Sequence, residues 1–324
     1  MKPEKILLIV NPVSGRMKSK TGLFEILDEL YRDGATATSD GKHDPNRRVT
    51  VIPTMHRGHA TTLAADSAAE GYDTVVCCGG DGTFNETVSG LMQIPPEKRP
   101  ALGYIPAGST NDFAASMGLT GSLREAARLA VSPREMPLDA GLFSPISRTS
   151  HSPRVFTYIA SFGAFTAASY STPQVAKNHF GHLAYLLEGV KDFANLQPRH
   201  VVFDFPDGTR KEGDYVFGAV TNTTSAGGVV KIPAEKVSLS DGLLELFLVH
   251  MPKNPADLQR IATSLLAQDF ESCPLIELHH VESVKVLLEE NLSWSLDGEE
   301  AVGGKRIEIS CIRHAINFKR SGEA

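Results

Sequence analysis

The stretch VVCCGGDGTFNE, residues 75–86, joins a buried strand to a helix through a turn rich in glycine. The apolar run from Thr74 to Cys78 predicts the strand, and the helical period resumes at Asn85. Backbone N–H groups in such a turn, together with a helix N-terminus, form a site that can bind phosphate. A tight turn in which Asp81 only caps the helix is the alternative that this stretch leaves open.

On either side of this stretch, short apolar runs alternate with amphipathic segments through the first half of the chain. Strands are predicted at residues 5–10, 49–52, 74–78 and 101–105, and helices at 23–30, 59–70, 85–92 and 123–130. This alternation predicts a doubly wound, mostly parallel α/β sheet with helices on both faces. The polar segment 33–48 is expected to be a surface insertion.

The second half of the chain has a different rhythm. Runs rich in Val, Phe, Leu and Ile lie at residues 200–205, 215–221, 243–250, 283–288, 292–296 and 306–312, with Asp-Gly pairs at Asp207, Asp241 and Asp297. They predict an antiparallel, β-sandwich-like domain interrupted by helices at 183–194 and 258–266, and the segment 144–154 is expected to be a loop. We therefore predict a nucleotide-binding α/β domain at 1–137 and a β-rich domain at 138–312, with 313–324 able to return to the first domain.

Length and composition agree with two globular domains. The 324 residues are 41% hydrophobic, which is too apolar for a disordered chain, and the net charge of −6 disfavours binding of nucleic acid through its phosphates. The four cysteines lack the spacing of metal ligands, and the only tryptophan, Trp294, is expected in the core. The apolar run near the N-terminus is too short for a signal peptide or a membrane span, so a cytoplasmic protein is expected.

Two further turns follow strands of the first half. Residues 11–16, NPVSGR, come after the first strand, and residues 106–114, PAGSTNDFA, come after the strand at 101–105. Open α/β sheets bind ligands at the carboxyl ends of their strands, so three such turns on one edge favour a ligand site over three unrelated turns. A Walker A motif is absent and the spacing of Gly-x-Gly-x-x-Gly is not met, which makes an ordinary P-loop or dinucleotide site a weak reading.

Seven strings together resemble the diacylglycerol kinase catalytic family, particularly its soluble bacterial lipid kinases. They are NPVSG, RGHA, GGDGTFNE, PAGSTNDFA, FGHLAYLLEG, SDGLLEL and LDGEE, which begin at residues 11, 57, 79, 106, 180, 240 and 296. GGDGT alone is shared with NAD kinases and, more distantly, phosphofructokinases. The resemblance implies an ATP- and Mg²⁺-dependent lipid kinase that makes phosphatidic acid from diacylglycerol or a related lipid, with its active site between the two domains.

The resemblance also implies roles for individual residues. The nucleotide is expected against Asn11, Ser14, Gly15, Gly79, Gly80, Asp81, Gly82, Thr83, Gly108, Ser109 and Thr110. A network of Asp81, Asp112, Asp139 and Lys177 is expected to hold Mg²⁺ with the nucleotide, since carboxylates that follow buried segments can bind this ion directly or through its waters. Asp139 that only satisfies backbone groups and Lys177 as a solvated loop residue are the plainer alternatives.

Two Asp-Gly turns in the second half acquire functions from the same resemblance. Asp241, with nearby carbonyls such as that of Leu243, is expected to bind a structural Mg²⁺, although the residues alone favour a plain hairpin turn. Glu299 is implied as the general base, and the adjacent Glu300 is expected to face solvent.

The expected partners are a lipid substrate and a membrane surface contacted peripherally, with a homodimer as a further possibility and nucleic acid excluded. Two rival functions remain open. One is a NAD kinase, which shares GGDGT, and the other is a catalytically silent regulator that binds nucleotide or lipid. Loss of Asp81 or Glu299 would favour the silent regulator, and this chain has both.

Overall fold

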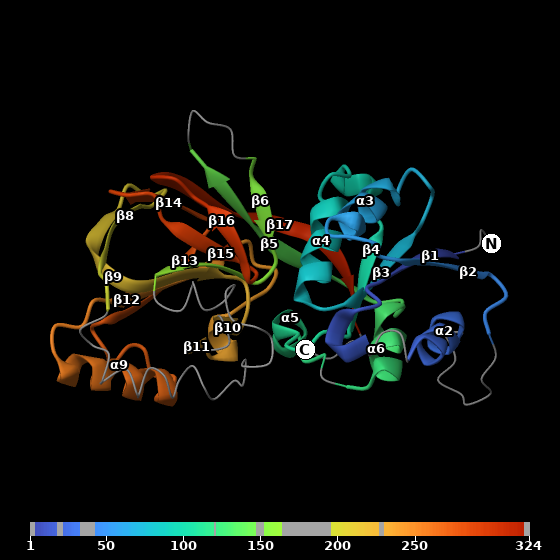
Figure 1. The fold of residues 1–324 in the computed structure, drawn as a ribbon, viewed down its shortest axis with the longest axis horizontal. Coiled ribbons are helices and arrows are strands. Elements are labelled where there is room, and N and C mark those ends of the chain that lie inside the picture. The colour runs from blue at the N-terminus through green and yellow to red at the C-terminus, as the bar shows by residue number, and fades with distance from the viewer. Residues whose placement is uncertain are drawn as a thin grey trace. The chain divides into compact units, whose positions relative to one another are not determined.

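The computed structural model describes residues 4–17, 22–32, 43–119, 121–146, 152–163, 196–226 and 230–320 (Figure 1). The described residues form two compact units. The first comprises Met1–Leu138 and His314–Ala324, and the second comprises Asp139–Arg313. The chain passes between the units within two strands, β5 (Glu135–Pro145) and β17 (Arg306–Lys319).

The first unit contains a parallel sheet in the order β2-β1-β3-β4-β17. Its other strands are β1 (Glu4–Val10), β2 (Arg47–Pro53), β3 (Thr74–Gly79) and β4 (Ala101–Pro106). Every residue of β3 is buried, which explains why its sequence is an unbroken apolar run rather than an alternating pattern. The adjacent cysteines of β3 face opposite sides of the sheet, as successive strand residues must.

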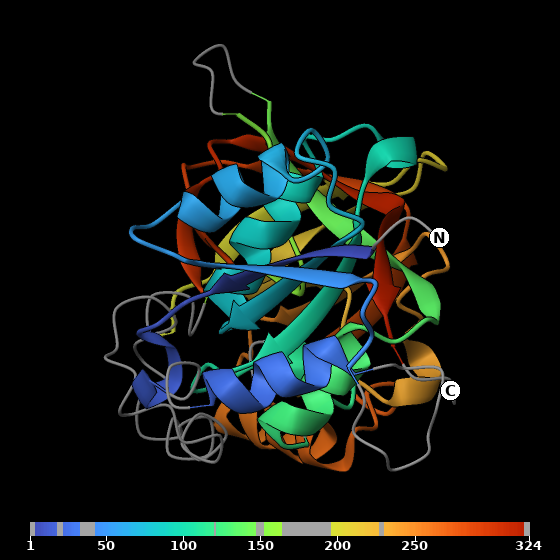
Figure 2. The same ribbon diagram turned by 90° about the vertical axis from the view of Figure 1, so that its right-hand side faces the viewer.

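Helices cover both faces of this sheet (Figure 2). On one face, α2 (Leu23–Tyr31) and α6 (Leu123–Ala130) share a core cluster with Ile6, Leu8 and Cys78. The other face carries α3 (His59–Asp66) and α4 (Asp81–Leu91), which contact each other. A shorter helix, α5 (Asp112–Ser116), follows β4. The predicted doubly wound α/β arrangement is therefore confirmed.

The second unit is built from antiparallel strand pairs around a core that contains Phe143, Phe162, Phe203 and Trp294. Its further strands are β6 (Arg154–Phe156), β7 (Ile159–Gly163), β8 (Arg199–Asp204), β9 (Arg210–Thr221), β10 (Ser225–Ala226), β11 (Val230–Lys231), β12 (Leu244–His250), β13 (Ile276–Val281), β14 (Ser283–Leu288), β15 (Ser293–Leu296) and β16 (Glu299–Val302). One long helix, α9 (Pro255–Ala267), begins at Pro255, and the preceding Asn254 caps it by accepting a hydrogen bond from Asp257 N.

Three sequence expectations need correction. The helix predicted from Asn85 begins at Asp81, because glycines that look like a loop occupy its first turn. The helix predicted to reach Glu70 ends at Asp66. Arg47 was expected in a surface insertion, but it is buried at the start of β2, where it pairs with Glu4 at 2.9 Å. The helix predicted at 183–194 lies outside the described residues, and Trp294 is in the core as predicted.

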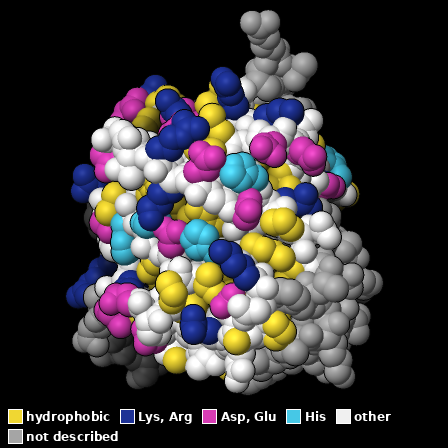
Figure 3. Space-filling model, turned by 90° about the vertical axis from the view of Figure 1, so that its left-hand side faces the viewer, with side chains coloured by type: hydrophobic (Ala, Val, Ile, Leu, Met, Phe, Trp, Pro, Cys, Tyr) yellow, Lys and Arg dark blue, Asp and Glu magenta, His cyan; other side chains and the backbone are white. Residues whose placement is uncertain are grey.

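One end of the molecule carries mixed surface charge (Figure 3). Basic, acidic and histidine side chains alternate on this face instead of gathering by sign. In the second unit, for example, the Glu277 carboxylate contacts Lys211 Nζ at 2.5 Å, His250 Nε2 at 2.5 Å and His279 Nε2 at 2.7 Å. Hydrogen bonds from these side chains hold the pKa of Glu277 well below its usual range. The acidic and basic side chains of this cluster thus contact one another, as is typical of a solvated surface.

Candidate functional sites

The three predicted turns of the first unit converge at the carboxyl edge of its sheet. Strand register sets this edge, since Val10 lies beside Cys78, and Gly79 lies beside Pro106. Asn11 Nδ2 donates a hydrogen bond to Thr83 Oγ1 at 2.9 Å, and Ala107 N donates to Gly79 O at 2.7 Å. The structure thus brings together the residues that the sequence places in three separate motifs.

The convergence is close enough to require glycine. Gly15 has a φ of +49°, and a Cβ added there would lie 2.0 Å from Ala107 O. A Cβ on Gly108 would lie 2.5 Å from Gly80 Cα. At these two positions the turns are therefore joined by backbone contacts that only glycine permits.

Gly82 differs from its neighbours, because a Cβ added to it would meet no atom of the described residues within 4 Å outside its own helical turn. It is the second residue of α4, in the helical turn whose N–H groups have no acceptor within the helix. Open space at the N-terminus of a helix is the arrangement that accepts phosphate. Packing among the described residues therefore does not explain a glycine here, whereas the close approach of a ligand would.

Asp81 and Asp112 lie at the starts of neighbouring helices. Asp81 begins α4, and its Oδ1 accepts a hydrogen bond from Phe113 N in α5 at 3.2 Å. Asp112 is the first residue of α5 and is half-buried. The two carboxylates are therefore at one edge of the first unit, next to the glycine turns. Ser109 is exposed and Thr110 is half-buried in the same turn.

Sequence reasoning missed Asn111 as a residue that shapes this site. Its φ of 54° lies in the left-handed region, which Asn tolerates better than most residues. Its Oδ1 accepts from Gly108 N at 2.8 Å and its Nδ2 donates to Gly108 O at 3.0 Å. The side chain thus fixes the backbone of the PAGSTND turn. The Gly-x-x-Asn spacing was the available signal.

Asp139 has its described partners in the second unit. Its Oδ2 accepts from Gly242 N at 2.6 Å, and its own N–H donates to Leu239 O at 2.8 Å. The carboxylate therefore anchors the Asp241 turn, and its expected part in a nucleotide network stays a prediction. Lys177, the fourth member of that network, lies outside the described residues.

The Asp241 turn sits beside a buried acid that the sequence analysis overlooked. Asp241 Oδ1 accepts from Leu243 N at 2.9 Å. Glu245 on β12 is fully buried, and neither carboxylate oxygen has a hydrogen-bond partner among the residues that the structure describes. Burial, and then the neighbouring charges of Asp241 and Asp139, raise the pKa of Glu245 to about 8. A glutamate inside the run LLELFLV was the signal that could have identified it.

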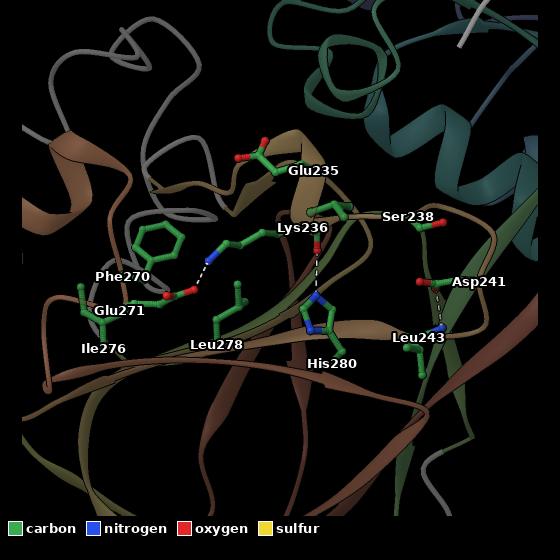
Figure 4. A pocket seen from close by; sticks show the side chains of 11 residues that line it. Glu235, Lys236, Ser238, Asp241, Leu243, Phe270, Glu271, Ile276, Leu278 and His280 are labelled. Atoms are coloured by element: carbon green, nitrogen blue, oxygen red, sulfur yellow. Dashed lines mark hydrogen bonds and ion pairs between the residues drawn. The ribbon is translucent and has the colours of Figure 1, made fainter.

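A pocket of about 660 Å³ opens next to this turn (Figure 4). Leu243, Phe270, Ile276 and Leu278 give it an apolar floor, and Asp241 stands at one end with Ser238. Lys236 spans part of the opening, because its Nζ contacts Glu271 Oε1 at 2.5 Å while its carbonyl bonds to His280 Nε2 at 2.7 Å. The Asp241 carboxylate is therefore accessible from solvent, whereas Glu245 is not.

Asp297, in the turn of the hairpin that bears Glu299, fixes this hairpin through its side chain. Asp297 and Gly298 have φ values of 49° and 86°, as a tight two-residue hairpin requires, and Leu296 pairs with Glu299. The Asp297 carboxylate is buried and accepts hydrogen bonds from Thr157 N at 2.6 Å, Thr157 Oγ1 at 2.7 Å, Tyr158 N at 3.0 Å and Ile159 N at 2.9 Å. Burial raises the pKa of Asp297, and these donors oppose that rise.

Replacing Asp297 with Ala should destabilise the protein by at least about 2 kcal/mol, because buried N–H donors would lose their acceptor. The measurement is the free energy of unfolding in urea. Asp207→Ala is the matched control, since Asp207 precedes a glycine in the same unit but is exposed and accepts from Thr209 N. Equal losses in the two variants would contradict a structural role that is special to Asp297.

Glu299 and Glu300 differ in their partners. The Glu299 carboxylate is partly exposed, and its Oε2 lies 3.2 Å from an Nη of Arg154. Glu300 is exposed and its Oε1 accepts from Ser293 Oγ at 3.2 Å. The structure thus gives the candidate base an ion pair that its neighbour lacks among the described residues.

Residues 5–143 match the family described as the diacylglycerol kinase catalytic domain, and residues 160–317 match the YegS C-terminal NAD kinase beta sandwich-like domain. A diacylglycerol kinase of Bacillus subtilis (strain 168) is 32% identical over 293 residues, which cover 90% of this chain and 88% of that protein.

A second relative, from Chromohalobacter salexigens, is described as a probable lipid kinase YegS-like. It is 33% identical over 256 residues, 79% of each protein. A solved structure of a candidate diacylglycerol kinase from Bacillus anthracis str. Sterne has a TM-score of 0.76 at 26% identity, over 99% of this chain and 96% of that one.

Proposed function

The chain belongs to the diacylglycerol kinase catalytic family, and from this premise we propose that it is an ATP- and Mg²⁺-dependent lipid kinase acting on the free hydroxyl of diacylglycerol or a related lipid. The observation that carries the proposal is the convergence of three turns at one sheet edge, with open space at Gly82. Phosphatidic acid and ADP are the proposed products.

In this proposal the first unit holds the nucleotide. Backbone N–H groups at the start of α4 and in the turns at Asn11–Gly15 and Gly108–Thr110 would orient the phosphates and offset their charge. Asp81 and Asp112 are the first-unit carboxylates that would hold Mg²⁺, directly or through water. When bound, that ion neutralises charge that develops on the phosphates during transfer.

Glu299 is proposed to accept the proton of the lipid hydroxyl as the bond to phosphorus forms. A neutral hydroxyl is a poor nucleophile, so a carboxylate within hydrogen-bond reach of it is needed. Asp81 suits this role less well, because its Oδ1 already accepts from Phe113 N in α5. The proposal places the acceptor lipid on the second unit.

A second ion at the Asp241 turn fits the residues that are present. Glu245 is a buried carboxyl without a hydrogen-bond partner among the described residues, and Asp139 and Asp241 are close enough to disfavour its charge. A cation at Asp241 would offset this excess of acid. No three His, Cys, Asp or Glu side chains of the described ranges form a metal cluster, so carbonyls such as that of Leu243, and water, would complete the shell.

We expect Asp241→Ala to abolish the stabilisation that Mg²⁺ confers while changing turnover per folded molecule by less than about twofold. An ion that binds only the native state stabilises it by mass action, and the variant would lack its charged ligand. Thermal melts with excess Mg²⁺ and with EDTA measure the effect, and Asp207→Ala is the control at another Asp-Gly turn. If Mg²⁺ shifts the melting temperature of Asp241→Ala and the wild type alike, the turn binds no ion.

The substrate assay tests the proposed function directly. Purified protein is incubated with labelled ATP and, in separate reactions, diacylglycerol, a sphingoid base, another lipid alcohol in detergent micelles, or NAD. A labelled lipid product supports the proposal. Labelled NADP in the absence of lipid product would favour the NAD kinase alternative, and no transfer to any acceptor would favour a silent regulator.

Contact with the membrane surface and formation of a homodimer remain predictions. Within the described ranges, no helix has both the length and the apolar character that crossing a bilayer requires. We propose that the protein reaches its lipid through a peripheral contact with the membrane during turnover.

A further inference from the structure

Arg154 holds the Glu299 hairpin at two points. One Nη of its guanidinium lies 3.2 Å from Glu299 Oε2, and the other donates to the carbonyl of Glu300 at 3.0 Å. The same side chain thus contacts the carboxylate and the backbone one residue further along β16. Such a fork can fix both the side-chain rotamer and the strand that carries it.

The segment that begins at Arg154 also holds the other side of the turn. Thr157, Tyr158 and Ile159 donate the hydrogen bonds that the Asp297 carboxylate accepts. Four residues of the segment 154–159 therefore contact either Asp297, which forms the turn, or the start of β16, which follows it. These contacts all lie within the second unit.

Glutamate is a flexible side chain, so its carboxylate is rarely aimed in one direction without help. The side chains of Arg154 and Glu299 are both 39% exposed. An ion pair as accessible to water as this one adds little to folding stability. An arginine in this position is therefore not explained by stability. It is explained if the direction of the Glu299 carboxylate matters for the reaction.

We propose that Arg154 is a positioning residue that acts through Glu299 and aims its carboxylate at the lipid hydroxyl. This inference rests on the proposed function of Glu299. Arg154 itself transfers no proton in this scheme. Its guanidinium keeps the Glu299 side chain in one rotamer. Its contact with the Glu300 carbonyl fixes the backbone of β16 from which that side chain extends.

A double-mutant cycle tests the proposal on the full-length protein. Arg154→Gln is expected to lower kcat for diacylglycerol phosphorylation by about tenfold, since misplacing a catalytic group by a fraction of an ångström costs this order of rate. ATP affinity and melting temperature should not change. Arg154→Lys keeps the charge but not the fork, so it should recover part of the loss. In the Glu299→Gln background, Arg154→Gln should cause no further loss.

Arg210→Gln is the matched control, because Arg210 also forms a solvent-exposed ion pair, with Asp204 at 3.5 Å, in the same unit. It should leave kcat unchanged. The proposal is overturned if Arg154→Gln lowers kcat by the same factor with and without Glu299, if its loss appears only as weaker ATP binding or lower stability, or if it has no effect.

The role of Glu299 as base and the positioning role of Arg154 can be refuted separately. A Glu299→Gln protein with wild-type turnover would refute the proposed base and, with it, the role of Arg154. A Glu299→Gln protein that is inactive, combined with an Arg154→Gln variant as active as the wild type, would refute only the positioning role.

Discussion

Glu299→Gln should reduce lipid phosphorylation by about a hundredfold or more while leaving ATP affinity nearly intact. Gln keeps the shape of the side chain and can still accept a hydrogen bond from Arg154, but it cannot take a proton from the acceptor hydroxyl at neutral pH. Steady-state kinetics with lipid in mixed micelles measure the turnover, and a separate equilibrium titration measures ATP binding.

Two variants bracket this result. Glu300→Gln changes the neighbouring, exposed carboxylate and should lower turnover by less than about twofold, as expected of a surface group outside the site. Asp81→Asn should weaken both Mg²⁺-ATP binding and turnover, because Asp81 lies at the glycine turns. Near wild-type turnover in Glu299→Gln would remove Glu299 from the mechanism and make Asp81 the next candidate.

Gly82→Val should lower kcat/KM for ATP by about a hundredfold, because displacing a phosphate by about 1 Å costs this order of rate. The structure makes this variant informative, since a Cβ at Gly82 meets no atom of the described residues within 4 Å outside its own helical turn, so we expect little change in stability. Gly82→Ala, with one added carbon, should cause a smaller loss in the same direction. ATP titrations and thermal melts on each variant separate ligand exclusion from destabilisation.

Two other glycines act as controls for this interpretation. Gly108→Val should destabilise the first unit as well as abolish binding, because its Cβ would lie 2.5 Å from Gly80 Cα. Gly213→Val, on β9 in the second unit, has only ordinary contacts with Tyr215 and should not affect ATP binding. If Gly82→Val binds ATP as the wild type does, the nucleotide does not approach this turn.

The sheet of the first unit could be predicted because its signals are local. An unbroken apolar run identifies a strand such as β3, and the helical period of residues 23–30 identifies α2. The start of α4 was missed because glycine is a poor helix former in general, yet it is tolerated in a first turn whose N–H groups face open space. Helix propensity does not report whether a ligand must approach the backbone closely.

The parts of the candidate sites that sequence reasoning missed depend on contacts between distant residues. Arg154 fell in a segment expected to be a loop, and its partner is 145 positions away. Asp139 follows a buried segment just as Asp81 does, but its described partner is Gly242, 103 positions further along. Strand β13 was missed because IELHHV, with an acid and two histidines, does not resemble a strand of a buried core. Only the fold brings such pairs together.

The two adjacent cysteines of β3 can report local opening of the first unit. Cys77 and Cys78 are fully buried, and burial raises the pKa of both thiols, that of Cys78 to about 12, so we expect both to resist alkylation while the helices cover the sheet. Cys78 lies under α2 and α6, while Cys77 lies on the opposite face, near Thr87 of α4. Each helical layer therefore covers one sulfur of its own. In single-cysteine variants, the alkylation rate of each thiol measures how often the helices on its face move away from the sheet. Comparing the two rates shows whether the two faces open together or independently.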